Sequence, residues 1–323
     1  MSKYVVVVGN KGQDGQLLET SLLRKGLNVV GINRDGAFIR GHRIDDFGHS
    51  FSVLKKQHTD WLVKSFRPTE IYYLAGYHCS SEAISSMDDH LEYTYSHSVN
   101  VYGLVNCLSG IRAYSPKTRL FYASSSLVFS GDESSVQSES TPFSPSGFYG
   151  ITKAIGISVC REYRESFGVF AASGILYNHE SVLRKDSFAS MKIIKAAYRI
   201  SKGLQSGLTL GSMRAEVDWG YAPDFVEAFQ AILALDVAED FIVSTNDSHS
   251  IEEFCSIAFA CAGLEYKKYV NVEESLLTRA PRKRVGDNRK LRLMTNWSPS
   301  VNFSTMVKRI YSDYEQLASS SGQ

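Results

Sequence analysis

The chain has 323 residues, and its 35 Lys and Arg residues nearly balance its 34 Asp and Glu residues. This length allows one large or two small domains with a substantial core. The interspersed charges exclude a strongly basic or acidic surface, so neither nucleic acid nor an anionic membrane is expected as a partner. No apolar run approaches the ~18 residues that suggest a membrane span.

The cysteines and the first residues bear on the compartment. The 5 cysteines are odd in number and show no C-x-x-C spacing, which favours reduced core thiols over a zinc or disulfide framework. The stretch M-S-K-Y-V-V-V-V-G is too short in apolar residues for a signal peptide. A cytoplasmic protein is therefore expected. His49, His58 and His78 lack ligand-like spacing, so no metal site is predicted.

In chain order, β-branched runs alternate with helical periodicity. Strands are expected at 4–8, 28–32, 70–75, 119–124 and 169–176, and helices at 17–25, 59–66, 91–112 and 149–167. Residues 34–57 are polar and irregular, and 130–147 form a loop rich in Ser, Pro and Gly. This alternation predicts an α/β fold, a Rossmann-type doubly wound parallel sheet with helices on both faces.

Beyond Asn178 the alternation ends. Isolated helices are expected at 187–201, 224–235, 251–262 and 304–317. The segments at about 178–212 and 251–323 are expected to form a smaller substrate-binding lobe above the carboxyl edge of the sheet, where ligands bind in such folds. The predicted division is a cofactor-binding Rossmann domain over 1–177 plus about 213–250, and the substrate-binding lobe over about 178–212 and 251–323.

A glycine-rich turn, G-N-K-G-Q-D-G, joins the first strand to the first helix. Small residues let the backbone approach a pyrophosphate, and the helix N-terminus offers free N–H groups. The spacing G-x-x-G-x-x-G differs from the commoner G-x-G-x-x-G, and glycines would also suit a plain packed turn. The turn predicts a dinucleotide site that includes Gly9, Gly12, Gln13, Asp14 and Gly15.

The end of the second strand bears on the choice between NADP and NAD. NAD sites usually place an acidic residue there to hold the ribose diol, whereas this chain has Asn33 followed by Arg34. A guanidinium suits a 2′-phosphate, so NADP is favoured. Asp35 keeps NAD open as the cofactor, because a small loop shift would bring its carboxylate to the ribose.

Tyr149 and Lys153 lie four residues apart at the start of an expected helix, and therefore share one helix face. A lysine ammonium beside a phenol can lower the phenol pKa from its usual ~10. The tyrosine can then exchange a proton with a sugar hydroxyl while a nicotinamide exchanges a hydride. Y-x-x-x-K alone recurs by chance, but the upstream serines and the glycine turn strengthen the prediction.

Several further stretches carry a family resemblance. They are E-I-Y-Y-L-A-G at 70–76, T-P-F-S-P at 141–145, G-I-L-Y-N-H-E-S at 174–181, F-A-S-M-K-I at 188–193, L-G-S at 210–212, D-W-G-Y-A-P-D-F-V-E at 218–227 and the closing G-D-N-R-K-L…N-W-S-P. With the glycine turn they resemble the extended short-chain dehydrogenases/reductases, and most closely the GDP-mannose 4,6-dehydratase branch. The resemblance implies a GDP-linked substrate, and a homodimer or homotetramer in which the helices at 91–112 and 149–167 form the dimer contact.

The resemblance also implies roles for individual residues. Ser125 or Ser126 would hold the C4 oxygen of the sugar beside Tyr149, and Lys153 would also hold the nicotinamide ribose. The remaining cofactor contacts would be Leu74, Ala75, Gly76 and His179. The backbone around Leu210 and Gly211 would contact the guanosine. The candidates for the nucleotide diphosphate are Asn178, Arg184, Lys192 and Arg279, because two negative phosphates need Arg or Lys donors.

Other interpretations of these residues stay open. His179 suits a packed structural histidine equally well, and Arg184 and Arg279 would also suit a solvated surface. Arg282, Lys283 and Arg284 follow Arg279 closely and could take its place. Asn100 is expected either to anchor a buried link toward Lys153 or to be purely structural.

The chain departs from the family directly after the catalytic strand. Family dehydratases carry Thr-Ser-Glu there, and the glutamate removes the C5 proton so that water can leave C6. Aligned without gaps, this triplet falls on Ser125, Ser126 and Leu127, and leucine cannot act as a base. S-S-S-L-V-F-S-G instead resembles the nucleotide-sugar 4-ketoreductases. Val217 also replaces an arginine that precedes D-W-G in the dehydratases.

These features favour NAD(P)-dependent 4-keto reduction, or the reverse C4 oxidation, of a GDP-linked deoxyhexose. Three alternatives stay open. The first is a GDP-mannose 4,6-dehydratase that takes its base from Asp132 or Glu133, and the second is an epimerase with transient C4 oxidation. The third is a non-catalytic NADP-binding protein, against which the complete Ser/Tyr/Lys set argues.

Overall fold

The computed structural model describes residues 3–45, 47, 51–77, 88–131, 136–277 and 282–320. Its largest sheet contains, in chain order, β1 (Tyr4–Val8), β2 (Asn28–Asn33), β3 (Gly36–Ile39), β4 (His42–Arg43), β5 (Glu70–Tyr73), β6 (Arg119–Ala123), β8 (Ala171–Leu176) and β13 (Asp240–Val243). The spatial order is β13-β8-β6-β5-β1-β2-β3-β4. From β13 to β2 every neighbouring pair is parallel, which confirms the predicted doubly wound α/β fold.

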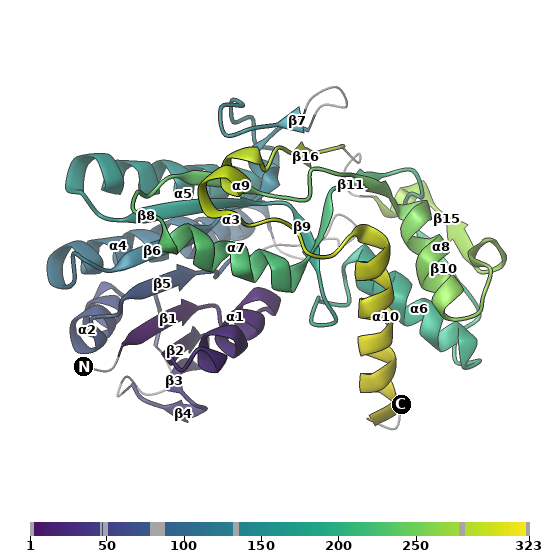
Figure 1. The fold of residues 1–323 in the computed structure, drawn as a ribbon, viewed down its shortest axis with the longest axis horizontal. Helices are drawn as coiled ribbons and strands as arrows, with labels where there is room; N and C mark the ends of the chain where they lie inside the picture. Colours follow the sequence, from purple (N-terminus) through teal and green to yellow (C-terminus); the bar gives the residue numbers. More distant parts are fainter. Residues whose placement is uncertain are drawn as a thin grey trace.

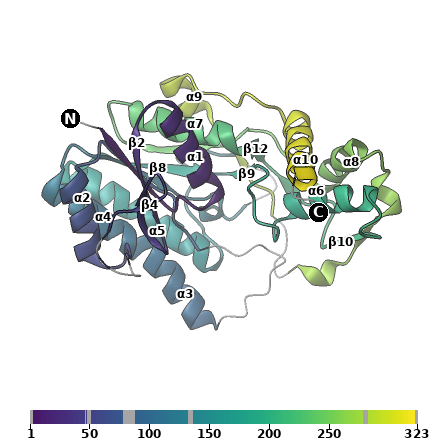
Figure 2. The same ribbon diagram turned by 90° about the horizontal axis from the view of Figure 1, so that it is seen from below.

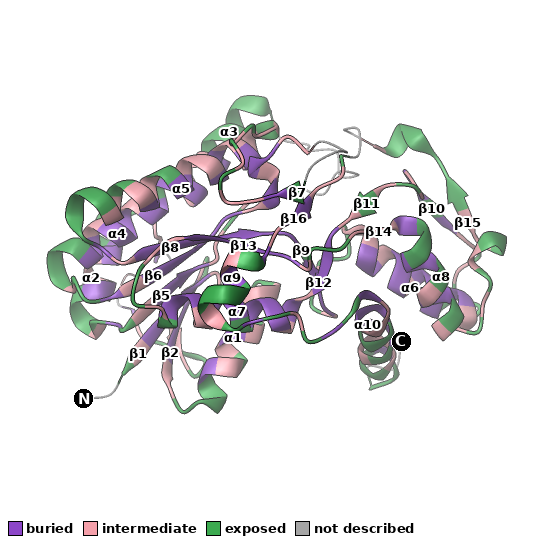
Figure 3. Ribbon diagram, turned by 45° about the horizontal axis from the view of Figure 1, so that its top comes forward, coloured by how far each residue is buried: buried purple, intermediate pink, exposed green. Residues whose placement is uncertain are grey.

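Helices cover both faces of this sheet (Figures 1 and 3). One face carries α2 (Lys56–Phe66), α4 (Gly103–Tyr114) and α5 (Gly147–Phe167), and the other carries α1 (Gln13–Arg24), α7 (Ala222–Ala234) and α9 (Arg289–Thr295). Both faces are apolar because the parallel strands are buried on both sides, as the valines of β1 illustrate. Because these strands are parallel, the loops that follow their carboxyl ends all lie at one edge of the sheet.

The sheet gains an antiparallel hairpin that the sequence did not indicate. Strands β3 and β4 lie within the stretch expected to be irregular, and they extend the edge beyond β2. The buried carboxylate of Asp45 stabilises the hairpin, because it accepts a hydrogen bond of 2.7 Å from the backbone N–H of Ala37 and pairs with Arg43. Edge strands of only four and two residues are too short to show the apolar alternation that identifies a strand in sequence.

A second lobe has a core of its own. It contains α6 (Ala189–Ser201), α8 (Ile251–Cys261) and α10 (Phe303–Ser320), with the small parallel pair β10 (Leu208–Leu210) and β15 (Val270–Val272). The single turns at Tyr266–Lys268 and Glu274–Leu276 flank β15. Figure 1 shows this lobe beside the sheet, with the C-terminus at the end of α10. No helix in the described part of the chain is long and apolar enough to cross a membrane.

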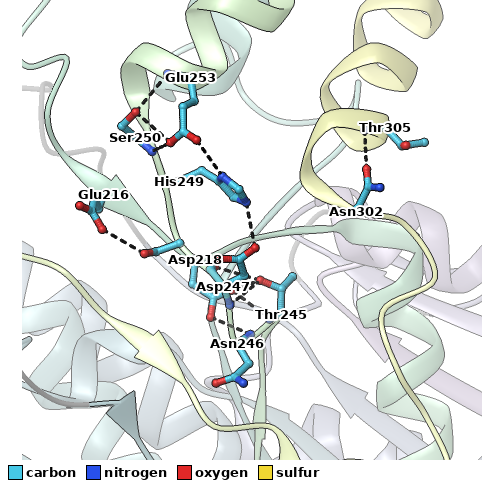
Figure 4. Close-up of polar contacts among 11 residues, drawn as sticks. Glu216, Asp218, Thr245, Asn246, Asp247, His249, Ser250, Glu253, Asn302 and Thr305 are labelled. Atoms are coloured by element: carbon cyan, nitrogen blue, oxygen red, sulfur yellow. Dashed lines mark hydrogen bonds and ion pairs between the residues drawn. The ribbon is translucent and has the colours of Figure 1, made fainter.

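Short strand pairs connect the two cores. They are β9 (Asn178–Glu180) with β12 (Trp219–Tyr221), β11 (Glu216–Val217) with β14 (His249–Ser250), and β7 (Val136–Gln137) with β16 (Val285–Gly286). The buried carboxylate of Asp218, between β11 and β12, joins these strands to the loop that follows β13 and to β16. It accepts hydrogen bonds from the backbone N–H groups of Thr245, Asn246 and Gly286, two of which Figure 4 shows. Burial raises the pKa of Asp218 to about 6.

Candidate active site

A cavity of about 660 Å³ lies where the carboxyl edge of the sheet faces the second lobe. The carboxyl ends of β5, β6 and β8 contribute Leu74, Gly76, the run Ala123–Leu127, and Leu176. Helix α5 contributes Tyr149 and Lys153, and the glycine turn contributes Gln13 and Asp14. The structure thus brings the predicted catalytic residues and part of the predicted cofactor site into one cavity. It lies at the edge where α/β sheets of this topology bind ligands.

Ser125, Tyr149 and Lys153 meet in the wall of this cavity. Ser125 begins a 3-10 turn (Ser126–Val128) directly after β6, and its side chain hydrogen bonds with Tyr149. Lys153 follows Tyr149 by one helical turn and is only 1% exposed. Its Nζ donates to the carbonyl of Ala123 at 2.7 Å and lies 5.5 Å from the centre of the Tyr149 ring. Ser126 is buried behind Ser125.

The ionisation of this group differs from the expectation. Withdrawal from solvent raises the pKa of Tyr149 to about 12, although Arg184 and the hydrogen bond with Ser125 act to lower it. Burial lowers the pKa of Lys153 to about 7. The phenol pKa of Tyr149 is thus raised, not lowered as the sequence led us to expect, because desolvation outweighs Arg184 and the Ser125 hydrogen bond, the groups that act to lower it. At neutral pH Tyr149 holds its proton.

Asn100 lies behind Lys153, in a helix that the sequence predicted to be continuous. A π-helical turn (Ser98–Tyr102) interrupts that helix between α3 (Asp89–His97) and α4. The Asn100 amide donates to Ser96 and Thr152, and its buried Oδ1 meets no donor among the described residues. A Cβ built on Gly76 would lie 3.3 Å from both this Oδ1 and Lys153 Nζ. Asn100 and Lys153 thus face the same small region beside Gly76.

The glycine turn has the tight geometry that close approach of the backbone requires. Gly9 has φ +96°, and a Cβ on Gly15 would lie 2.3 Å from the Gly9 carbonyl oxygen. Gly12 precedes the first turn of α1, so the N–H groups of Gln13 and Asp14 begin the helix. Only glycine fits at Gly9 and Gly15 without moving the backbone.

Arg34 and Asp35, the residues expected to distinguish NADP from NAD at the ribose, directly follow β2. Arg34 is exposed there, and Asp35 forms an ion pair with Lys11 across the glycine turn. The hydrogen bond from Lys11 and its charge hold the pKa of Asp35 below the ordinary value. The carboxylate that would suit a ribose diol is thus engaged by a lysine, while Arg34 remains exposed beside it.

The strand pair β9–β12 supplies polar lining to the same cavity. Asn178, His179 and Glu180 all line the cavity. Glu180 is 1% exposed, accepts a hydrogen bond of 2.6 Å from Ser190 Oγ and lies 3.4 Å from Arg184 Nε. The sequence prediction missed Glu180 as a cavity residue. Its available signal was an acidic residue shortly after the strand-like run 169–176, at the edge of the sheet where ligands bind.

Cations also gather around the cavity. Arg184, Lys185, Arg282 and Arg284 line it, and this set suits a diphosphate. Arg284 donates to the carbonyls of Phe129 and Ser130 and so also holds the segment that follows the 3-10 turn. Arg282 and Arg284 thus lie where the sequence offered them as replacements for Arg279, a residue that lies outside the described part of the chain.

The other predicted substrate contacts do not line this cavity. Lys192 lies on α6, and Leu210 is buried at the end of β10 in the core of the second lobe. Gly211 follows Leu210, and the neighbouring Ser212 reaches the cavity instead. Asp132 and Glu133 lie outside the described residues.

Leu127 lies in the cavity wall at the position where the resemblance places a glutamate. Helix α5 packs closely on it, since a Cβ on Gly150 would lie 2.5 Å from the Leu127 carbonyl oxygen. The carboxylates among the described lining residues are Asp14, Glu180, Glu216 and Asp218. Asp14 pairs with His179, Glu216 with Lys283, and Asp218 accepts several hydrogen bonds.

This fold and this cavity define the class of extended short-chain dehydrogenases/reductases. The RMD protein of Pseudomonas aeruginosa complexed with NADPH superposes with a TM-score of 0.81 at 21% identity, over 98% of this chain and 100% of that one. The UDP-glucose 4-epimerase of Thermus thermophilus complexed with NAD has a TM-score of 0.79 at 22% identity, over 97% and 99% of the two chains. At these sequence identities, the structural similarity establishes the fold alone.

Sequence comparison identifies the family. The model of the family described as GDP-mannose 4,6 dehydratase matches residues 6–310. GDP-mannose 4,6 dehydratase 2 of Arabidopsis thaliana is 32% identical over 98% of this chain and 88% of that protein. The GDP-mannose 4,6-dehydratase of Yersinia enterocolitica is 32% identical over 81% and 73%. The chain therefore belongs to the GDP-mannose 4,6 dehydratase family, as the sequence motifs indicated.

Proposed function

We propose that this protein is an enzyme that oxidises and reduces C4 of a GDP-linked hexose, with GDP-mannose as substrate and 4,6-dehydration as net reaction. The observation that carries the substrate is the family match over residues 6–310. The names of the relatives support dehydration better than the 4-keto reduction that the sequence favoured. The meeting of Ser125, Tyr149 and Lys153 in one cavity supports chemistry at a sugar hydroxyl.

The cofactor that suits the site is a nicotinamide dinucleotide, and we propose NADP. The close packing at Gly9 and Gly15, and the free Oδ1 of Asn100 beside Lys153, fit such a group. The residues that would hold it are the glycine turn, Leu74–Gly76, Lys153 and Arg34. Arg34 is exposed while Asp35 is paired with Lys11, which favours a 2′-phosphate. When bound, the nicotinamide supplies the hydride chemistry.

The residues of the chain would divide the remaining work. Tyr149 would exchange the proton of the C4 oxygen, and Ser125 would orient that oxygen through the hydrogen bond the two side chains share. Arg184, Arg282 and Arg284 would hold the diphosphate. The C5 proton requires a base other than Leu127. Glu180, which is buried in the cavity wall, joins Asp132 and Glu133 as a residue to test for this role.

The test is direct. The protein is incubated with GDP-mannose and NADP⁺, and separately with the 4-keto-6-deoxy product and NADPH. Mass spectrometry then separates loss of water from gain of two hydrogens. Dehydration at about 1 s⁻¹ or faster supports the proposal, and Glu180→Gln is the first variant to examine for the base. Reduction of the 4-keto sugar without dehydration of GDP-mannose would overturn it.

Two observations favour 4-keto reduction as the second candidate. Leu127 removes the family base, and the raised pKa of Tyr149 keeps its phenol protonated, the form that donates to a developing C4 alkoxide. In this case wild type should consume NADPH with the 4-keto sugar. Leu127→Glu would then test for trace dehydration, although a lone carboxyl in an apolar wall tends to stay protonated.

We also propose a homodimer formed through α3 and its continuation. Leu91 and Tyr95 on α3 and Tyr102 at the end of the π-helical turn are 54%, 39% and 55% exposed. Figure 2 shows α3 at the outer edge of the molecule. Large apolar side chains gathered on one exposed helix are typical of an interface.

A further inference from the structure

The first turn of α1 is hydrogen bonded to β9 and to the residue that follows it, in the wall of the cavity. Gln13 Nε2 donates to the carbonyl of His179 at 3.0 Å, and Ser181 Oγ donates to Gln13 Oε1 at 2.8 Å. His179 Nε2 lies 3.0 and 2.9 Å from the two carboxylate oxygens of Asp14. Residues some 165 positions apart in sequence are thus joined. We refer to Gln13, Asp14, His179 and Ser181 as the turn–strand clamp.

The partners of His179 determine its protonation. Its Nδ1 lies 2.7 Å from the carbonyl oxygen of Tyr177, which can only accept a hydrogen bond. Its Nε2 faces both oxygens of a carboxylate, which also only accepts when ionised. A neutral imidazole has a single N–H and cannot satisfy both partners. The geometry therefore requires His179 to carry a proton on each nitrogen.

The surroundings agree with a charged pair. Burial alone would lower the pKa of His179, but the charge and hydrogen bond of Asp14 outweigh burial and raise it. Burial alone would raise the pKa of Asp14, but the charge and hydrogen bond of His179 and the hydrogen bond of Gln13 outweigh burial and lower it. Arg184 is the other charged group that acts on both, and it opposes protonation of His179. From α7, only the uncharged ring of Phe225 stacks on the imidazole, 4.6 Å away.

We infer that the turn–strand clamp holds His179 as an imidazolium and makes cofactor binding at the glycine turn and nucleotide-sugar binding at residues 178–184 mutually dependent. This inference rests on the proposed function, since it requires both ligands to use the one cavity. Gln13 and Asp14 begin the helix that would receive the cofactor pyrophosphate. His179 lies in β9 next to Asn178, and Ser181 is the first residue after β9, three positions before Arg184.

Two physical effects produce the dependence. An acidic side chain at an anion-binding helix N-terminus opposes a pyrophosphate, and the imidazolium neutralises Asp14. A ligand that orders either end of the clamp also orders the other end through its hydrogen bonds, so the second ligand loses less conformational entropy on binding. By linkage, each ligand must raise the affinity of the other by the same factor.

The protonation is tested on the wild-type protein, which removes any question of misfolding. Protein with ¹⁵N-labelled histidine is observed by long-range ¹H–¹⁵N correlation at neutral pH and above, and the His179 signals are assigned with a His179→Gln sample. Two protonated ring nitrogens on His179 at pH 7, lost only as the pH rises further, are expected. A neutral His179 tautomer at pH 7 would overturn the inference.

The mutual dependence is tested by calorimetric titration with NADPH and GDP, each alone and with the other at saturation. We expect NADPH to tighten GDP binding in wild type by at least about fivefold. The factor should approach one in His179→Gln and fall partway in Ser181→Ala, which keeps the charge pair but loses the bond to Gln13. In wild type it should also decline as the pH rises through the raised pKa of His179.

The matched control is His249→Gln. His249 also lies between two carboxylates, with Nε2 3.1 Å from Asp247 and Nδ1 3.3 Å from Glu253 (Figure 4). Its ring stacks on Phe303, and it lines a separate, smaller depression. In this control variant, NADPH should tighten GDP binding by the same factor as in wild type. Thermal unfolding of each variant verifies that it is folded before titration.

The outcomes separate this inference from the proposed function. A wild-type factor near one, or an unchanged factor in folded His179→Gln, overturns the clamp while GDP binding still supports the substrate class. If NADPH binds but neither GDP nor GDP-mannose does, the proposed substrate and the mutual dependence both fall. If GDP binds and NADPH tightens its binding in wild type but not in His179→Gln, the clamp stands whatever the net reaction proves to be.

Discussion

The role proposed for Tyr149 depends on one hydroxyl, which hydrogen bonds with Ser125 and lines the cavity. Tyr149→Phe removes that hydroxyl alone. We expect turnover to fall roughly 10²-fold or more, the scale of a lost general acid–base group, while NADPH affinity is nearly kept. Steady-state rates and fluorescence titration of the cofactor measure the two quantities.

Tyr163→Phe is the control for that variant, because Tyr163 lies on the same helix α5 and does not line the cavity. It should retain wild-type turnover. Near-normal turnover of Tyr149→Phe would remove Tyr149 from the mechanism.

Arg34 should decide the preference between the two dinucleotides. Arg34→Ala is expected to weaken NADP(H) binding by about 1–3 kcal/mol, the range of charge-assisted hydrogen bonds, and to leave NAD(H) almost unchanged. Arg24→Ala, an exposed arginine at the last turn of α1, provides the control. Titrations with both cofactors measure the effect. Equal losses for NADP(H) and NAD(H) would contradict the assignment.

Residue identity and local spacing explain how much of the site could be predicted. Tyr149 and Lys153 share a helix face by their spacing, and the serines follow a strand, so their meeting could be expected. The partners of Asp14 and Gln13 could not, because His179 and Ser181 are 165 and 168 positions away in sequence. The ionisation of Tyr149 also escaped prediction, since desolvation depends on packing that spacing does not reveal.

At the level of elements, the parallel strands were predictable because each is a β-branched or aromatic run buried on both faces. The hairpin β3–β4 was not, since its strands are short and the Asp45 contacts that help to hold it depend on the fold. The π-helical turn at Ser98–Tyr102 was also missed, because the apolar pattern continues through it. That turn places Asn100 beside Lys153, so the missed feature lies at the candidate site.

Strand β13 is attached to α5 through a buried ion network. Asp240 is 7% exposed and lies 2.6 Å from Arg161 Nε and 3.0 Å from Arg164. Asp240→Asn would leave the Arg164 guanidinium without its counter-charge, so we expect the free energy of unfolding to fall by about 3–5 kcal/mol. Urea denaturation measures it. Asp287→Asn, which breaks a pair with the exposed Arg289, should cost only about 0–1 kcal/mol.

The same network predicts a dependence on pH. Burial alone would raise the pKa of Asp240, but Arg164 and Arg161 outweigh burial and hold it below the ordinary value. A carboxyl group with a lowered folded pKa stabilises the protein fully above its unfolded pKa of about 3.9. That stabilisation is lost as the pH falls through the folded pKa. The difference between wild type and Asp240→Asn should therefore shrink below pH ~4; a constant difference would contradict it.

On the scale of the whole molecule, two separate apolar cores meet along short strand pairs, and the cavity lies between them. Asp218 and the turn–strand clamp cross this junction with hydrogen bonds rather than apolar packing. The cavity is thus shaped by polar contacts between segments that are distant in sequence. This arrangement suits a site in which two ligands must be aligned with each other.

The proposed dimer is the remaining feature at this scale. If Leu91, Tyr95 and Tyr102 are buried against a second copy, light scattering should give about twice the chain mass of 36.0 kDa. Leu91→Asp combined with Tyr102→Asp would place two charges in an apolar interface, and the mass should fall to that of one chain. Leu293→Asp, at the 83% exposed Leu293 on α9, should leave the mass unchanged. A wild-type monomer at micromolar concentration would refute the dimer, and a doubly substituted dimer would place the interface elsewhere.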